Sequence, residues 1–159
     1  MRKEILLAVT ILVMFSVTFA AYSAQAKEPY ATAEEWGKYV VSRDSIPWTQ
    51  LSPGANTRMA CGDRILVSFI TMSPWSVFPK HAHEAEEIVF VVDGYMDEGI
   101  DGKLYRLNKG DVIKLPSNIP HAIYIYDVPC VSIDIFSPVR PDYIQKAKEQ
   151  ETFGVVISK

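Results

Sequence analysis

Short apolar runs, each ended by turn residues, occupy most of the chain after Ile46. They are rich in β-branched and aromatic residues, which favour strands over helices. The pattern predicts strands at 64–72, 87–92, 95–100, 103–107, 111–115, 119–126 and 130–136. Asp101-Gly102 lies between two of these strands and is a strong two-residue hairpin signal. Strands that recur roughly every 8–12 residues, with turns between them, indicate an all-β sandwich or barrel.

Helical signals flank this strand-rich region. Thr32 precedes the run Ala33-Glu34-Glu35-Trp36, which predicts an N-capped helical turn with acidic residues near its start. Pro138 and Pro141 end the last strand, and residues 143–151 have the composition of a terminal helix. We therefore divide the chain after residue 26 into three parts: an N-terminal extension (27–45), a β domain (46–141) and a C-terminal helix and tail (142–159).

The first 26 residues have the three-part pattern of a secretory signal peptide. Arg2 and Lys3 form a short basic start, residues 5–21 are almost entirely apolar, and Ala24-Gln25-Ala26 offers small residues to a signal peptidase. We expect cleavage after Ala26, export to the periplasm or the extracellular space, and no membrane attachment afterwards. The alternative is an uncleaved membrane anchor, because the apolar segment is long for a signal core and just short of a membrane span.

Composition and charge exclude several classes of protein. The chain has 159 residues and a net charge of −3, which disfavours a nucleic-acid partner held by phosphate neutralisation. Cys61 and Cys130 are too few for a cysteine-rich zinc module or a dense disulfide framework. In an exported chain the two cysteines can form one disulfide, but both can equally be buried thiols, and the sequence leaves these alternatives open.

All three histidines fall in two short segments. His81 and His83 lie in the run KHAHEAEE, which also contains Glu87, and His121 lies in a later predicted strand. Alternate residues of a strand face the same way, so one continuous or gently bent strand can aim His81, His83 and Glu87 inward. Two imidazoles and a carboxylate in an apolar interior are costly without a counter-charge. A divalent transition metal is the natural counter-charge, and imidazole and carboxylate ligands suit Fe, Mn, Ni, Co, Cu or Zn.

The spacing within the first segment follows a longer pattern. His81, His83, Glu87 and Gly94 fit Gly-x5-His-x-His-x3,4-Glu-x6-Gly. Trp75 stands where the opening glycine of that pattern would be. The pattern therefore begins, in this chain, at the first histidine.

The segment around the third histidine follows a second pattern, Gly-x5-Pro-x-Gly-x2-His-x3-Asn. Gly110, Pro116 and His121 fit it, while Ile125 replaces its final asparagine. Asn118 stands in place of its second glycine, and asparagine is the next-best residue for a positive φ. Taken together, the two patterns resemble those of the cupin superfamily, over about residues 46–141.

The resemblance to cupins implies a small antiparallel jelly-roll barrel with a metal in its mouth. Carried over residue by residue, it implies that His81, His83, Glu87 and His121 are the ligands of one divalent transition metal. Nitrogen and oxygen ligands of this kind suit several metals, so the identity of the metal stays open.

The end of the β domain resembles one group of cupins more closely. The run SIDIFSPVR resembles the Asp-x-Phe-Ser-Pro-x-Arg ending of single-domain cupins of the pectin-degradation type, which linearise unsaturated uronates. That resemblance implies that Asp134, Phe136 and Arg140 lie near the substrate, with Asp134 as a general acid or base and Arg140 as a partner of a substrate carboxylate. The alternatives are an Asp134 that pairs with an arginine and a solvated Arg140. This group commonly has glutamine as the fourth ligand, whereas this chain has Glu87.

Three functions remain open at this point. The first is an exported metal-dependent enzyme that acts on a small oxygenated, carbohydrate-derived substrate such as an unsaturated uronate, by isomerisation, ring opening or a lyase-type step. The second is an iron or copper dioxygenase, since the same ligands can activate O₂. The third is a non-catalytic protein that binds a metal or a small ligand. The fold does not choose among them, and the sequence is compatible with a homodimer.

Overall fold

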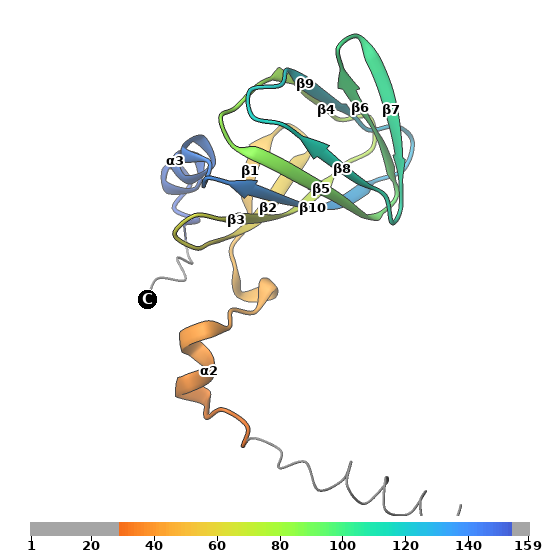
Figure 1. Ribbon diagram of the computed structural model, residues 1–159. Coiled ribbons are helices and arrows are strands. Elements are labelled where there is room, and N and C mark those ends of the chain that lie inside the picture. Colours follow the sequence, from red (N-terminus) through yellow and green to blue (C-terminus); the bar gives the residue numbers. More distant parts are fainter. Residues whose placement is uncertain (1–28, 154–159) are drawn as a thin grey trace, which may run out of the picture. The chain divides into compact units, whose positions relative to one another are not determined.

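The computed structural model describes residues 29–153 (Figure 1). The predicted signal peptide (1–26) and residues 154–159 lie outside the described residues. No helix within residues 29–153 is long and apolar enough to cross a membrane. Helix α2 (Ala33–Tyr39) and the short 3-10 helix η1 (Arg43–Ser45) fall in the predicted N-terminal extension, and α2 confirms the helical turn expected after Thr32.

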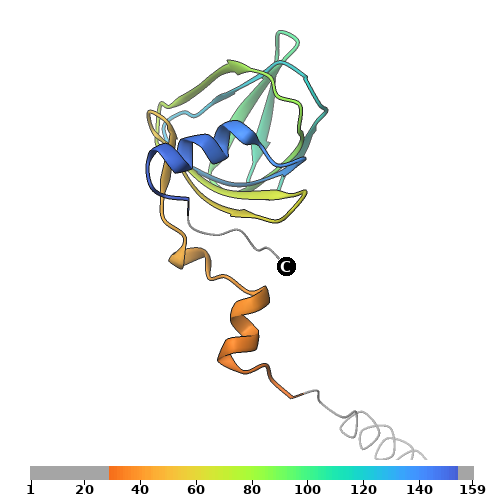
Figure 2. The ribbon, with the colours of Figure 1, turned by 90° about the vertical axis from the view of Figure 1, so that its left-hand side faces the viewer.

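The rest of the described chain is ten strands followed by helix α3 (Pro141–Glu149). In chain order the strands are β1 (Thr49–Ser52), β2 (Ala55–Cys61), β3 (Leu66–Met72), β4 (Val77–His81), β5 (Glu86–Asp93), β6 (Tyr95–Ile100), β7 (Lys103–Asn108), β8 (Val112–Leu115), β9 (His121–Tyr124) and β10 (Cys130–Ser137). They form a six-stranded antiparallel sheet, ordered β1-β2-β3-β10-β5-β8, and a four-stranded one, ordered β4-β9-β6-β7. Figures 1 and 2 show the two sheets facing each other across a common interior. The predicted all-β jelly-roll architecture is confirmed.

The interior is filled by every second side chain of the strands. In β3 and β10 the buried positions alternate with partly exposed ones, and Leu66, Ile70 and Phe136 are among the fully buried residues. In β5 the buried positions are Glu87, Val89 and Val91, as the alternation predicts. Glu87 is therefore the one acidic residue among the buried positions of β5, and it is the first of them.

All seven predicted strands are present, with their ends within two residues of the expected positions. Strands β1, β2 and β4 were not predicted, because none of them is an apolar run. Strand β1 is mostly polar, β2 places Asn56 and Arg58 between its buried residues, and β4 contains Pro79, which is typical of an edge strand. Indeed, β4 lies at the edge of the four-stranded sheet.

The prediction of one continuous strand through both histidines and Glu87 is wrong. Strand β4 ends at His81 in the four-stranded sheet, and β5 begins at Glu86 in the six-stranded sheet. His83 lies in the connection between them. The chain thus changes sheets between the two histidines and the acid, and the three side chains converge from both walls of the barrel.

Helix α3 begins at Pro141, two residues earlier than predicted, because proline is tolerated in the first turn of a helix. It buries Tyr143 and Ala147 and lies beside β1 (Figure 1). The Lys146 Nζ atom donates a hydrogen bond to the Leu51 carbonyl oxygen at 3.0 Å. The helix therefore covers the edge of the six-stranded sheet that β1 would otherwise leave open.

The two cysteines are buried free thiols. Cys61 pairs with Leu66 at one end of β3, and Cys130 pairs with Met72 at the other end. At roughly 3.3 Å per residue these ends lie about 20 Å apart, far beyond the reach of a disulfide. Of the two alternatives that the sequence left open, the structure has the buried thiols.

Candidate metal centre

The three histidines come together at one end of the four-stranded sheet. His81, at the end of β4, pairs directly with His121, at the start of β9. One ring nitrogen from each of His81, His83 and His121 lies within 4.8 Å of the others. The imidazole ring centroids of His81 and His121 are 4.3 Å apart, and those of His83 and His121 are 5.1 Å apart. Three imidazoles at these separations could hold one metal ion.

Each imidazole is oriented by the backbone. The Nδ1 atom of every one of the three rings lies at hydrogen-bond distance from a carbonyl oxygen two residues away. The distances are 2.9 Å from His81 to Pro79, 2.8 Å from His83 to Ala85 and 2.8 Å from His121 to Ile119. A carbonyl oxygen only accepts, so Nδ1 carries the proton, and Nε2 keeps the lone pair that a metal needs.

Burial keeps two of these rings in the neutral form that binds metals. Burial lowers the pKa of His81, and the neighbouring His121 lowers it further. Burial likewise lowers the pKa of His121, against the opposing effects of its hydrogen bond to Ile119 and of the Glu87 charge. Little proton competition is therefore expected at these two nitrogens near neutral pH.

Glu87 aims its carboxylate at the same point. Its side chain is only 4% exposed, and its Oε2 atom lies 3.1 Å from Nε2 of His83 and 3.5 Å from Nε2 of His121. With the protons on Nδ1, lone pairs of nitrogen and oxygen face one another across these gaps. A cation bound between these acceptors would offset their repulsion, so the residues fit a divalent transition metal.

Two of the three residues expected near a substrate flank this cluster closely. The Phe136 ring lies edge-on to the His83 ring, with centroids 5.6 Å apart. Arg140 is 5% exposed, and its guanidinium lies 4.1 Å from the centroid of the Tyr143 ring and 5.2 Å from that of Phe136. The alternative of a solvated Arg140 is therefore wrong.

Asp134 lies inside the barrel and is 2% exposed. Its Oδ1 atom accepts a hydrogen bond from Ser132 Oγ at 2.7 Å, while Arg140 forms its ion pair with Asp142 instead. Burial, and then the negative charge of Glu87, raise the pKa of Asp134 well above its ordinary value. A buried carboxyl of this kind favours its protonated form.

The sequence reasoning missed Glu98 on β6. Its side chain is 0% exposed, and neither carboxyl oxygen has a hydrogen-bond partner among residues 29–153. Burial, followed by the charges of Glu87 and Asp134, raises its pKa to about 9. The available signal was the alternation of the predicted strand 95–100, which gives Glu98 the same parity as the buried Met96.

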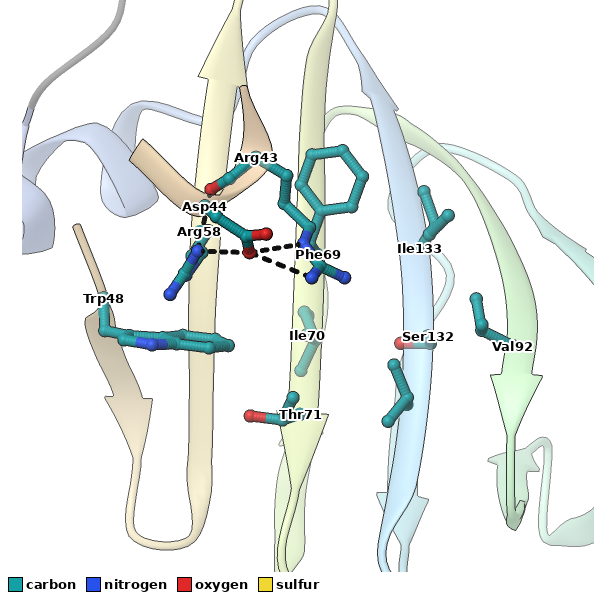
Figure 3. Close-up of a pocket in the computed structure, with 11 residues that line it drawn as sticks. Arg43, Asp44, Trp48, Arg58, Phe69, Ile70, Thr71, Val92, Ser132 and Ile133 are labelled. Carbon is teal, nitrogen blue, oxygen red and sulfur yellow. Dashed lines mark hydrogen bonds and ion pairs between the residues drawn. The ribbon is translucent and has the colours of Figure 1, made fainter. Parts of the chain in front are cut away.

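A separate pocket of about 340 Å³ lies on the outer face of the six-stranded sheet (Figure 3). There the Arg58 guanidinium lies over the Trp48 ring, 4.5 Å from its centroid, and donates to Asp44 at 2.8 Å. None of the candidate ligands or substrate-facing residues lines this pocket. The residues that the sequence predicts to bind a metal or a substrate therefore lie apart from this pocket, in and around the barrel interior.

Comparison with known proteins agrees with the geometry. The family model described as "Cupin domain" matches residues 68–136. The pectin degradation protein KdgF of Dickeya dadantii (strain 3937) is 25% identical over 103 residues, which cover 64% of this chain and 94% of that protein. The quercetin 2,3-dioxygenase of Bacillus subtilis (strain 168) is 29% identical over 98 residues, 60% of this chain but only 27% of that protein. The solved structure of KdgF from Halomonas sp. has a TM-score of 0.59 and 24% identity, covering 65% of this chain and 96% of that one.

Proposed function

Because the chain carries a cupin domain and is a distant homologue of the KdgF pectin degradation protein, we propose that it is a metal-dependent enzyme that opens the ring of an unsaturated uronate. The observation that carries the proposal is that Asp134, Phe136 and Arg140 are all buried in the barrel that holds the three clustered histidines, with the Phe136 ring packed against the His83 ring. An acid-base group and a guanidinium beside a metal centre are what a carboxylate-bearing substrate requires.

His81, His83, His121 and, as the fourth ligand, Glu87 would hold one divalent transition metal. When bound, the metal supplies Lewis-acid polarisation of a substrate oxygen. This donor set is compatible with several metals, and we propose none in particular.

Arg140 would bind the substrate carboxylate. Its hydrogen bonds to Asp142 use Nε and Nη2, which leaves the Nη1 donors for a ligand. The guanidinium is held between the rings of Tyr143 and Phe136, so its position is set before the substrate arrives. Phe136 would then serve as an apolar wall between the arginine and the histidines.

Asp134 would move the proton. Conversion of a cyclic unsaturated uronate to its open keto form is an isomerisation and consumes no second substrate. One proton leaves the hydroxyl of the hemiacetal carbon, one is added to the ring double bond, and a ring carbon–oxygen bond breaks. A buried carboxyl on β10, at the position that pairs with Val89 two residues from Glu87, can perform both transfers in turn.

A second candidate function is an iron- or copper-dependent dioxygenase. Glu87 supports it, because cupins of the pectin-degradation type commonly carry glutamine at this position. The similarity to a quercetin 2,3-dioxygenase supports it as well, although the chain spans about a quarter of that protein's length. We also propose that residues 1–26 direct export, so that either activity would operate outside the cytoplasm.

The test compares turnover of unsaturated galacturonate by metal-loaded protein, chelated protein and the variants D134N and D63N. Asp63 is exposed and serves as the matched control. The proposal expects turnover only with metal, a large loss in D134N and none in D63N. Full activity in D134N would rule out its proton-transfer role. Oxygen uptake with a catechol, without uronate turnover, would favour the dioxygenase, and no activity in either assay would favour a binding protein.

A further inference from the structure

Glu98 is a buried acid that the proposed reaction does not yet use. Its side chain is 0% exposed, and both carboxyl oxygens lack a hydrogen-bond partner in the described part of the chain. The neighbouring acid in sequence, Asp97, shows the usual alternative, because it accepts hydrogen bonds from Arg106 and Tyr126. Leaving a buried carboxyl without a partner destabilises a fold, so its retention points to a ligand.

The strand registers place Glu98 beneath the histidines. On β6, Glu98 lies two residues before the position that pairs with His121. On the facing sheet, Asp134 pairs with the position two residues after Glu87. Strands β5 and β6 are joined by a tight turn at Gly94. We call the height of Glu87 and His121 along the barrel the metal level. Glu98 and Asp134 both lie on the side of the metal level that faces this turn. Glu98 and Asp134 are therefore at the same level of the barrel, one layer deeper than the metal ligands.

A basic group thus lies on one side of the metal level, and acidic groups lie on the other. Arg140 follows β10 beyond Phe136, which pairs with Glu87 at the metal level, and Asp134 precedes it. A guanidinium on one side and two carboxyls on the other suit a small molecule with a carboxylate at one end and hydroxyl groups at the other.

We propose that Glu98 is a further substrate-binding residue, whose carboxyl hydrogen-bonds a hydroxyl group of a sugar acid at the end remote from Arg140. This inference rests on the proposed function, because that function supplies the substrate. It adds the direction in which the substrate lies along the barrel. It also explains why a strand that faces the core carries an acid between Met96 and Ile100.

The test measures binding separately from catalysis. Titration calorimetry of metal-loaded protein with galacturonate, which retains the carboxylate and the hydroxyls, is compared for the parent, E98Q, E98M and E86Q. Glu86 is exposed, pairs with Lys114 and serves as the matched control. Loss of one hydrogen bond to a carboxyl should weaken galacturonate binding by about 10- to 100-fold in E98M. E98Q keeps an acceptor and should retain most of the affinity, and E86Q should match the parent.

Two further measurements separate this role from a structural one. Metal content should be equal in all four proteins, and the Tm of E98M should rise by a few degrees, because an unpartnered carboxyl is removed. Parent-like binding by E98M, or no binding of galacturonate by the parent, would overturn the inference. So would loss of a second metal equivalent in E98Q, which would make Glu98 a cation ligand. If galacturonate binding depends on Glu98 but unsaturated galacturonate is not turned over, the inference stands and the proposed function fails.

Discussion

Stability of the metal-free protein should fall as pH rises, and Glu98 should be a main cause. Its pKa is raised from 4.5 to about 9 in the folded protein, first by burial and then by the charges of Glu87 and Asp134. Between these two values the folded state binds one proton more than the unfolded state, so the free energy of unfolding decreases with pH. One proton corresponds to about 1.4 kcal/mol per pH unit, which amounts to about 2.7 kcal/mol from about pH 6 to about pH 8.

The assay is urea unfolding of the parent, E98Q and E86Q in the presence of a chelator at both pH values. The parent should lose about 2.7 kcal/mol relative to E98Q, which has no carboxyl to titrate at this position. Glu86 is exposed and ion-paired, so E86Q should follow the parent. Asp134 contributes to the slope in both the parent and E98Q, and the comparison removes most of its effect. Parallel profiles for the parent and E98Q would refute the reasoning, because Glu98 would then ionise near its ordinary pKa inside the folded protein.

Four further outcomes follow from the site. H121A should retain less than about a tenth of the parent's metal by plasma mass spectrometry, since it removes one of three clustered imidazoles; stoichiometric metal in H121A would contradict the ligand assignment. D134N should lower kcat by about 100-fold or more with metal content unchanged, and an unchanged kcat would exclude Asp134 as the proton carrier. R140K should raise KM about tenfold, because lysine cannot make the planar bidentate contact; an unaltered KM would place the substrate carboxylate elsewhere. Cys61 and Cys130 should react with a thiol reagent only after unfolding, and an intact mass that indicates an oxidised pair would contradict the structure.

Much of the fold follows from the alternation of apolar and polar residues. That alternation identified seven strands and gave Glu87 the inward parity that the structure has. Strand β2 was not predicted from its sequence, because the inward side chains of a barrel strand need not all be apolar. Its inward Thr57 is satisfied by a hydroxyl contact of 2.6 Å with Ser68, a partner that only the tertiary structure supplies.

The site was predicted by spacing, but its construction was not. The sequence analysis placed His81, His83 and Glu87 on one face of a single strand. In the structure the chain crosses from one sheet to the other after His81, and this crossing brings the three side chains together. Glu98 was missed because an acid next to Asp97, close to a hairpin turn, looks like a solvated pair. Its parity with Met96 within the predicted strand indicated an inward orientation, but its closeness to the level of the histidines depends on the register of β6 with β9, which a single segment does not contain.

The hydrogen bonds that orient the three imidazoles all end on main-chain carbonyl oxygens. No exchange of a side chain can delete a carbonyl acceptor, so substitutions of the residues around the histidines can disturb these contacts only by moving the backbone. The orientation of the three histidines should consequently tolerate wide variation in the residues around them. An evolving lineage, or a protein engineer, can change the residues that select the substrate while the metal-binding geometry stays intact.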